Sequence, residues 1–200
     1  MTDEPEIFIA LDGVDGSGNT THTSLLAKWI WESLGRKTLL TKEPTTGPTG
    51  RLIREYLRMP GTSSATDALL FAVDRMEHVE KIIKPALSKD MAVVTDRYLE
   101  SSIAYQSAQG LPTDWILAIN RYAMRPSLNI ILDIEPEKSL QRKPLLTEKF
   151  EEANFLRKVR TILLSRAKSE KYPVVNTSGP INETQAKIND IVRKFLEHRK

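Results

Sequence analysis

The sequence predicts an α/β protein in which helices cover both faces of a parallel β-sheet. Short apolar runs alternate along the chain with longer segments whose apolar residues recur at helical spacing. Such alternation is typical of strand–helix–strand units, whose helices pack on the two faces of a parallel sheet. The run from Ile7 to Leu11 is apolar throughout and ends in a glycine-rich turn, which predicts a central strand buried on both faces.

Further apolar segments complete the predicted sheet, and helical patterns lie between them. The other strands are expected at Lys37–Thr41, Met91–Thr95, Asn129–Leu132 and Pro173–Val175. The helices are expected at Thr20–Leu34, Gly50–Arg58, Thr66–Leu87, Thr113–Tyr122, Pro136–Gln141, Glu148–Lys171 and Asn182–His198. Because neither a repeat nor a linker divides the chain, we expect a single domain over residues 1–200.

A basic segment at about residues 142–150 interrupts two of the helical patterns. It carries Arg142, Lys143 and Lys149, with Pro144 among them. Cations on a mobile segment can close over phosphate groups and stabilise charge in a transition state. We therefore expect a short lid here, while a solvated basic loop is the alternative interpretation.

The composition excludes several classes of protein. The chain is 40% hydrophobic and 28% charged, which is the balance of a globular protein. Its net charge is only +3 and its basic residues are spread out, which argues against a nucleic-acid binder. Without cysteine it has no disulfide and no thiolate metal site, and no apolar run approaches the roughly 20 residues of a membrane span. These features favour a cytoplasmic protein with no membrane partner.

A glycine-rich motif directly follows the first predicted strand and opens the first predicted helix. It consists of Gly13, Val14, Asp15, Gly16, Ser17, Gly18, Asn19 and Thr20, followed by Thr21. Its spacing matches the phosphate loop G-x-x-x-x-G-K-[ST], whose glycines let successive backbone N–H groups point at phosphates. The positive N-terminal end of the following helix adds to this attraction. The motif predicts a nucleotide site with the Thr20 hydroxyl on Mg²⁺, and a glycine-rich turn without a ligand is the alternative.

Position 19 departs from this motif, because Asn19 stands where phosphate loops carry lysine. Most phosphate donors in such loops are backbone N–H groups, so we expect phosphate binding to persist. Phosphoryl transfer, in contrast, loses a cation at the β and γ phosphates. Lys42, Arg142 and Lys143 are basic residues that the sequence offers in its place.

Asp96 and Arg97 follow the third predicted strand, at the edge where open parallel sheets bind ligands. An arginine there can hold a phosphate through two parallel hydrogen bonds. The neighbouring aspartate can accept from that arginine or hold the water shell of a metal ion. Both are candidate catalytic residues, and an ordinary surface ion pair is the alternative.

Further side chains are candidates for binding a substrate. Phe71 and Arg75 lie four residues apart in a helical pattern, so they share one face, where a ring can stack on a flat heterocycle and a guanidinium can donate to its carbonyl oxygen. A core phenylalanine beside a surface arginine would give the same pattern. Near the ends of the predicted strands, the sequence adds Glu43, Ser101, Ser102, Tyr105 and Gln106.

In combination, these motifs resemble thymidylate kinases over nearly the whole chain. The matching segments, in order, are Phe8–Gly18, Glu43-Pro44, Leu69–Arg75, Asp96–Tyr98 with Ser101–Gln106, Leu132–Glu137, Phe150-Glu151 and Phe155-Leu156. Their order and spacing together are specific. The resemblance implies a P-loop nucleoside-monophosphate kinase fold with a five-stranded parallel sheet, ATP and Mg²⁺ as cofactors, dTMP as the phosphoryl acceptor, and a homodimer.

The resemblance also implies how the acceptor nucleoside is bound. Phe71 would stack on thymine, and Arg75 would bind the base. Tyr105 would lie under the deoxyribose and disfavour a 2′-hydroxyl group.

For the phosphates, the resemblance implies four candidate catalytic residues. Arg97 would bind the acceptor phosphate, and Asp15 and Asp96 would lie near the site of transfer. Arg142 corresponds to an arginine that packs near the adenine of ATP.

The chain departs from the family pattern at three places, and these leave other functions open. Asn19 replaces the lysine of the loop, Ser107-Ala108-Gln109 replaces a glycine-containing stretch, and the lid is short, with lysines in place of some arginines. One alternative is a kinase for another nucleoside monophosphate. The other is a catalytically impaired or binding-only nucleotide module, which Asn19 favours.

Overall fold

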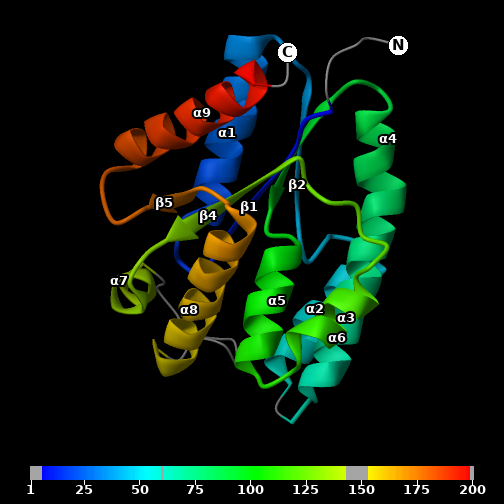
Figure 1. Cartoon of the computed structure of the whole chain (residues 1–200). Helices are drawn as coiled ribbons and strands as arrows, with labels where there is room; N and C mark the ends of the chain where they lie inside the picture. Colours follow the sequence, from blue (N-terminus) through cyan, green and yellow to red (C-terminus); the bar gives the residue numbers. More distant parts are fainter. Residues whose placement is uncertain (1–5, 60, 143–152, 199–200) are drawn as a thin grey trace.

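The computed structural model of the chain describes residues 6–59, 61–142 and 153–198. At its centre is a five-stranded sheet in the order β2-β3-β1-β4-β5, with every neighbouring pair parallel (Figure 1). The strands are β1 (Phe8–Gly13), β2 (Thr38–Lys42), β3 (Ala92–Asp96), β4 (Leu128–Asp133) and β5 (Val174–Asn176). Each overlaps a strand expected from the sequence, and the predicted fold class is confirmed.

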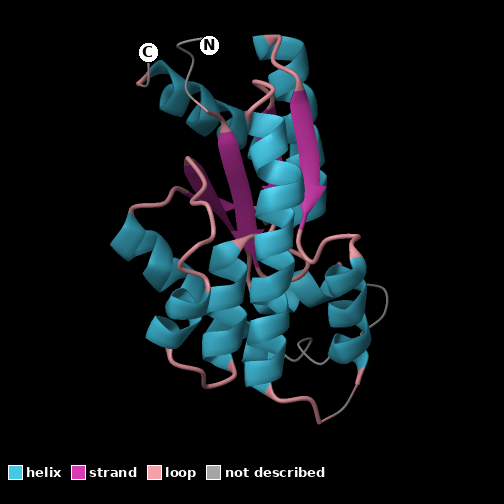
Figure 2. Cartoon of the chain, turned by 90° about the vertical axis from the view of Figure 1, so that its right-hand side faces the viewer, coloured by secondary structure: helices cyan, strands magenta, loops and turns pink. Residues whose placement is uncertain are grey.

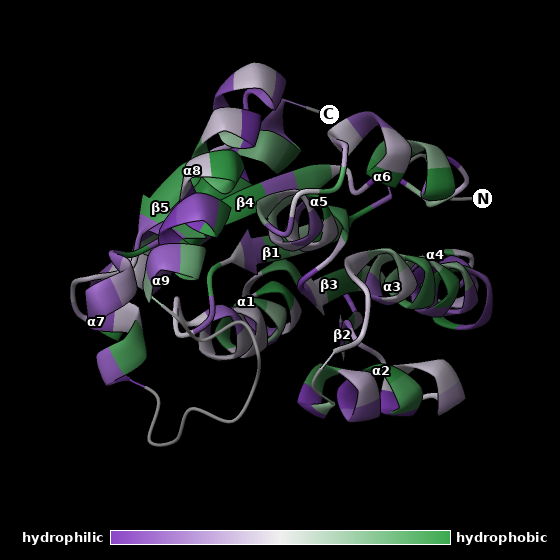
Figure 3. Ribbon diagram, turned by 90° about the horizontal axis from the view of Figure 1, so that it is seen from below, coloured by the Kyte–Doolittle hydropathy of each residue, from purple (hydrophilic) through white to green (hydrophobic). Residues whose placement is uncertain are grey.

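The two faces of the central strand β1 enter different cores. Ile9 and Leu11 pack with residues of α1 (Asn19–Leu34) and α9 (Ile181–Glu197). Phe8 and Ala10 belong to a cluster on the opposite face. Because successive side chains of a strand point to opposite faces, a strand buried on both sides must be apolar at every position. Figure 3 shows the hydrophobic strands β3 and β4 enclosed between helices.

Most of the remaining helices gather around the carboxyl ends of the strands, whereas α4 (Lys84–Leu87) lies near their amino ends, shortly before β3 begins (Figure 1). In Figure 2 the strand arrows end where the lower cluster of helices begins. The helices are α2 (Pro48–Arg58), α3 (Ser64–His78), α4 (Lys84–Leu87), α5 (Leu99–Ala108), α6 (Thr113–Ile119), α7 (Pro136–Gln141) and α8 (Ala153–Glu170). Helix α2 packs on α3, and α5 packs on α8. None of the helices in the described ranges is long and apolar enough to cross a membrane.

The helix expected at Thr66–Leu87 is present but contains a wider turn. Between α3 and α4, η1 (Val79–Ile83) is a π-helix, and the Lys84 N–H donates to the carbonyl of Val79. Pro85 follows, and a proline inside a helix lacks an N–H and clashes with the preceding turn. The widened turn accommodates the proline, so the helix continues to Leu87.

Helix α5 was not expected from the sequence. Every residue from Leu99 to Gln106 is buried, including the polar Glu100, Ser101 and Ser102. A helix with no exposed stripe has no apolar periodicity to detect. Of the predicted lid, only Arg142 belongs to the described residues, and 143–150 lie outside them.

Candidate active site

Two adjoining cavities lie at the carboxyl edge of the sheet and contain nearly all of the predicted site residues. The smaller cavity is lined by Glu43, Phe71, Arg75, Arg97, Ser101, Ser102, Tyr105 and Gln106, among others. The larger cavity is lined by Val14, Asp15, Gly16, Gly18, Asn19, Thr20 and Thr21, with Lys42, Asp96 and Arg142. Asp15, Glu43, Pro44 and Arg97 line both, so the two cavities meet at these residues.

The glycines of the predicted phosphate loop are required by its shape. Gly16 and Gly18 have φ values of 77° and 92°, in the left-handed region that other residues rarely adopt. A Cβ atom on Gly13 would lie 2.5 Å from Ser17 Oγ, so Gly13 and the buried Ser17 support the loop from behind. Helix α1 begins directly after Gly18 and presents its N-terminal end to the larger cavity.

Asn19 is held against the loop. Its Oδ1 accepts a hydrogen bond from the Ser17 hydroxyl at 3.1 Å, and the side chain is 6% exposed. Its Nδ2 is buried and has no hydrogen-bond partner among the described residues. An amide in this position carries no charge to offer a phosphate.

Thr20 and Asp96, the predicted metal ligands, are in direct contact. The Thr20 hydroxyl donates to Asp96 Oδ2 at 2.6 Å. Within the described part of the chain, no group of three or more His, Cys, Asp or Glu side chains is placed to hold a metal ion. A pair of hard oxygen ligands fits Mg²⁺, which keeps several waters and takes the rest of its shell from phosphates.

Arg97 lies where the two cavities meet. Its guanidinium donates to the Gly13 carbonyl at 2.7 Å and pairs with Asp15 Oδ1 at 2.5 Å. It also lies over the ring of Tyr105, 5.3 Å from its centroid. The backbone of Arg97 has φ of 68°, which is uncommon for a residue other than glycine and marks local strain of the kind found at functional sites.

The charges around Arg97 shift two pKa values. Burial works against the Arg97 cation, but the negative groups around it, Asp15 and Asp96 among them, outweigh burial and raise its pKa. Burial raises the pKa of the Tyr105 hydroxyl, as does the charge of Asp15. Arg97 is therefore charged, and the Tyr105 hydroxyl is neutral and accepts from the Asp15 N–H at 2.9 Å.

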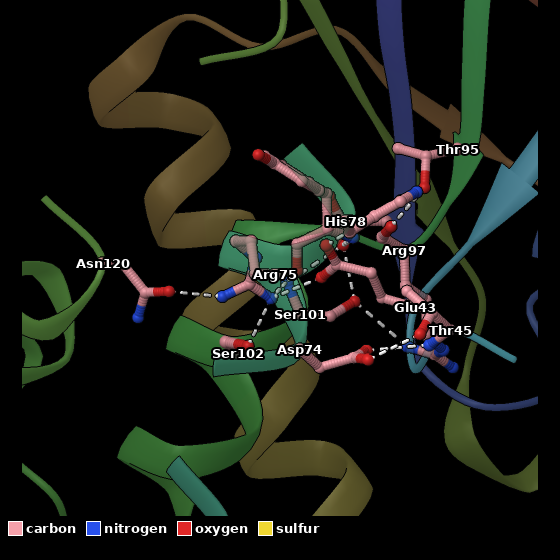
Figure 4. Close-up of polar contacts among 12 residues, drawn as sticks. Glu43, Thr45, Asp74, Arg75, His78, Thr95, Arg97, Ser101, Ser102 and Asn120 are labelled. Atoms are coloured by element: carbon pink, nitrogen blue, oxygen red, sulfur yellow. Dashed lines mark hydrogen bonds and ion pairs between the residues drawn. The ribbon is translucent and has the colours of Figure 1, made fainter. Parts of the chain in front are cut away.

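Arg75 is the centre of a buried network beside the smaller cavity (Figure 4). It donates to Glu43 Oε2 at 2.7 Å, to Ser102 Oγ at 2.7 Å and to Asn120 Oδ1 at 2.6 Å. The other carboxylate oxygen of Glu43 lies 3.0 Å from His78 Nδ1. The Arg75 Nε is buried and has no hydrogen-bond partner among the described residues.

Phe71 and Arg75 share a face of α3, as their spacing predicts, but their surroundings differ. Phe71 is half-buried at the wall of the smaller cavity, and Arg75 is 1% exposed. The alternative of a surface arginine is therefore wrong. Phe71 is only partly buried, whereas the Arg75 guanidinium is fixed by protein groups.

Three residues that support the site were not predicted. His78 contacts Glu43, and Asn120 accepts a hydrogen bond from Arg75. Neither residue belongs to a sequence motif that would have marked it. Asp12, at the end of a buried strand, is the third. Its Oδ1 accepts from the Tyr98 and Ser101 N–H groups at 2.9 and 3.0 Å and from the Ser101 hydroxyl at 2.5 Å, so it caps helix α5. Burial raises the pKa of Asp12 to about 6. The sequence signal that could have marked Asp12 is a carboxylate directly after the apolar run that forms the buried strand.

Arg142 connects the end of α7 to the phosphate loop. It donates to the Thr177 carbonyl at 2.8 Å and to the Gly16 carbonyl at 3.4 Å. It thereby lines the larger cavity on the side away from Asp96 and Lys42.

Comparisons with known proteins agree on one family. A family model described as thymidylate kinase matches residues 11–188. A protein of Pyrobaculum calidifontis named "Probable thymidylate kinase" is 44% identical over 193 residues, covering 95% of this chain and 97% of that protein. Proteins of the same name are 43% identical in Pyrococcus horikoshii, covering 94% of this chain and 97% of the relative, and 36% identical in Caldivirga maquilingensis, covering 93% and 91%.

Proposed function

This chain belongs to the thymidylate kinase family, and we propose that it transfers the γ-phosphoryl group of ATP to dTMP, giving ADP and dTDP. The smaller cavity is then the acceptor site and the larger cavity the donor site. The observation that carries the proposal is that the two cavities meet at Arg97 and Asp15. An in-line displacement needs both phosphates at one point, with cationic groups around them.

The transfer itself needs no protein base. An oxygen of the dTMP phosphate, already deprotonated, forms a bond to the γ-phosphorus while the bond from that phosphorus to the β–γ bridging oxygen breaks. ADP keeps the electron pair, and no proton moves. The protein positions the groups and offsets their charge, and Arg97 is the side chain proposed to hold the acceptor phosphate.

Two oxygen ligands support Mg²⁺ at the larger cavity, namely the Thr20 hydroxyl and the Asp96 carboxylate. The ion supplies neutralisation of the β and γ phosphates when bound. Backbone N–H groups of the glycine loop and the start of α1 hold the same phosphates. Arg142, beside Gly16, is proposed to pack near the adenine.

The smaller cavity supports a pyrimidine deoxynucleotide. Phe71, Arg75 and Gln106 line this cavity, and the buried Arg75 Nε and Gln106 Oε1 have no partner among the described residues. A donor and an acceptor next to a stacking ring match the carbonyl and N–H edge of thymine. The Tyr105 ring, also in this wall, is proposed to lie under the deoxyribose.

A coupled assay of ADP release tests the function. ATP, Mg²⁺ and one of dTMP, dUMP, dCMP, UMP or AMP are supplied in parallel, and we expect the highest kcat/KM with dTMP. Preference for another monophosphate would favour a different kinase on the same scaffold. Binding of ATP and dTMP without turnover would favour the binding-only alternative that Asn19 raises.

We also propose a cytoplasmic homodimer. Helices α2 and α3 pack on each other and carry exposed apolar side chains, Leu52 on the first and Leu69 and Val73 on the second. Leu69 and Val73 are 48% and 51% exposed and one helical turn apart, so they form an apolar strip for a second copy. Sedimentation of the wild type and of Val73→Asp tests this, because a charge on the strip should give monomers.

A further inference from the structure

The larger cavity lacks the lysine that phosphate loops use to meet the charge developing on ATP. Asn19 cannot replace it, because its amide is uncharged and its Oδ1 is bound to the Ser17 hydroxyl. We propose that Lys42, the last residue of β2, supplies this positive charge to the β and γ phosphates. The inference rests on the proposed function, since it concerns the same donor site.

The sheet places Lys42 close to the phosphate loop. In the parallel pairing of β2 and β3, Lys42 is in register with Asp96, and neighbouring strands lie about 4.8 Å apart. Asp96 in turn accepts the hydrogen bond from Thr20, in the first turn of α1. Lys42 is therefore one strand away from a residue that touches the loop helix, and both Lys42 and Asn19 line the larger cavity.

The Lys42 ammonium is available for a ligand. Its side chain is exposed, and it makes no hydrogen bond or ion pair with any residue that the structure describes. The flexible four-carbon stem lets a lysine follow a phosphate as its charge shifts. The Lys42 side chain is therefore placed to reach a ligand in the larger cavity, which it lines.

The arginines that line the same cavity differ from Lys42, because each has a protein partner, and Arg97 and Arg142 are proposed to serve the acceptor phosphate and the adenine. Arg54 donates to three backbone carbonyl groups. Arg97 is paired with Asp15, and Arg142 donates to two further carbonyl groups. Among the lysine and arginine residues that line this cavity within the described ranges, Lys42 is the one whose side chain has no hydrogen-bond or ion-pair partner.

The chemistry requires a cation at this point. As the bond to the γ-phosphorus breaks, the electron pair and its negative charge move onto the β–γ bridging oxygen. Loss of one preorganised donor at such a centre lowers the rate by about 10²–10³. An ammonium that reaches the β and γ phosphates stabilises this charge more in the transition state than in the ground state, so its removal should lower kcat more than ATP affinity.

The test compares Lys42→Ala with Lys37→Ala. Lys37 is also exposed, and it directly precedes the first residue of β2. We expect kcat for dTMP-dependent ADP release to fall about 10²–10³-fold in the first variant and to stay near the wild-type value in the second. Asn19→Lys combined with Lys42→Ala should recover at least about tenfold, because the new ammonium occupies the usual position. Asn19→Lys alone should raise kcat far less than it does in the Lys42→Ala background, because Lys42 already supplies the positive charge in the single variant.

A binding measurement separates this inference from the proposed function. Calorimetric titration with a non-hydrolysable ATP analogue should show a several-fold loss in Lys42→Ala, whereas AMP, which lacks the β and γ phosphates, should bind unchanged. A wild type that releases no ADP with dTMP would contradict the proposed function, and the titration would still decide the role of Lys42. Equal kcat and equal analogue affinity in wild type and Lys42→Ala, with equal melting temperatures, would overturn the inference.

Discussion

The guanidinium of Arg75 and the carboxylate of Glu43 form an ion pair with an Nη2–Oε2 distance of 2.7 Å, and their side chains are only 1% and 3% exposed. The pair joins helix α3 to the loop after β2, at the wall of the smaller cavity. His78 binds the other oxygen of Glu43, so the carboxylate has a protein partner on each side. A buried charge in such a pair depends on its partner, because water cannot replace that partner.

Glu43→Gln should therefore lower both stability and dTMP binding. Removing one partner of a buried ion pair costs about 3–5 kcal/mol of unfolding free energy, because the other charge stays buried and unpaired. Urea unfolding measures this loss. The matched control is Glu80→Gln, since Glu80 pairs with Lys84 at 2.6 Å on the exposed surface and should change stability by less than about 1 kcal/mol. Equal losses in the two variants would contradict a stabilising role for the Glu43–Arg75 pair.

Phe71→Ala should weaken dTMP binding selectively. Loss of an aromatic stack on a base costs about 1–3 kcal/mol, and Phe71 lines the smaller cavity but not the larger one. Calorimetric titration with dTMP and with ATP should show a loss for dTMP alone. Phe195→Ala, in helix α9, serves as the control for general loss of packing. A similar weakening of both ligands would mean that Phe71 acts through the core.

Arg97→Lys should lower kcat/KM strongly while the melting temperature changes little. Arg97 spans Gly13 and Asp15 with a planar group, and an ammonium cannot reproduce two parallel bonds to a phosphate. Steady-state kinetics with dTMP as the varied substrate measure the effect. Arg36→Lys is the control, because Arg36 pairs with Asp90 and lines neither cavity. Activity within about threefold of the wild type would remove Arg97 from the list of phosphate ligands.

The sequence was sufficient for the strands and for most residues of the two cavities, because both follow from local patterns. The run from Ile7 to Leu11 is apolar at every position, and the strand it predicts is buried on both faces. Glycine is required at positions 13, 16 and 18 for steric reasons, as the spacing of the motif already implied. The direct contact of Thr20 and Asp96 also follows from the sequence, because the loop after β1 leads into α1 at the same edge of the sheet where β3 ends.

The buried polar network could not be predicted, because its partners are distant in sequence. The helical spacing left open whether Arg75 binds a substrate or lies on the surface, yet Asn120, 45 residues away, and Glu43, 32 residues away, enclose its guanidinium. Helix α5 was missed for a related reason: Ser101 and Ser102 are polar but buried against Asp12, Arg97 and Arg75, so polarity did not mark an exposed face. Tertiary contacts decide both cases, and no local pattern records them.

Asp12 should make the stability of the fold depend on pH. Burial raises the pKa of this carboxyl to about 6, and the neighbouring Glu100 raises it further, while hydrogen bonds from Ser101 and Tyr98 and the charge of Arg97 lower it. An unfolded chain releases this proton near pH 4. Between about pH 4 and 6 Asp12 therefore binds more protons in the folded protein than in the unfolded chain, so its contribution to the free energy of unfolding falls as pH rises through this window.

Asp12→Asn should remove that pH dependence. The amide keeps an oxygen for the Tyr98 and Ser101 N–H groups, and its NH₂ takes the place of Oδ2, which has no partner among the described residues. It has no charge to desolvate, so the variant should match or fall below the wild type near pH 4 and gain on it as pH rises. The total gain by pH 7 should be on the order of 3 kcal/mol, the free-energy equivalent of a shift of about two pKa units. Urea unfolding of both proteins at intervals from pH 4 to 7.5 measures the difference directly. A difference that stays constant across this range would show that Asp12 titrates alike in the folded and unfolded states, and its burial beneath helix α5 would then carry no electrostatic penalty.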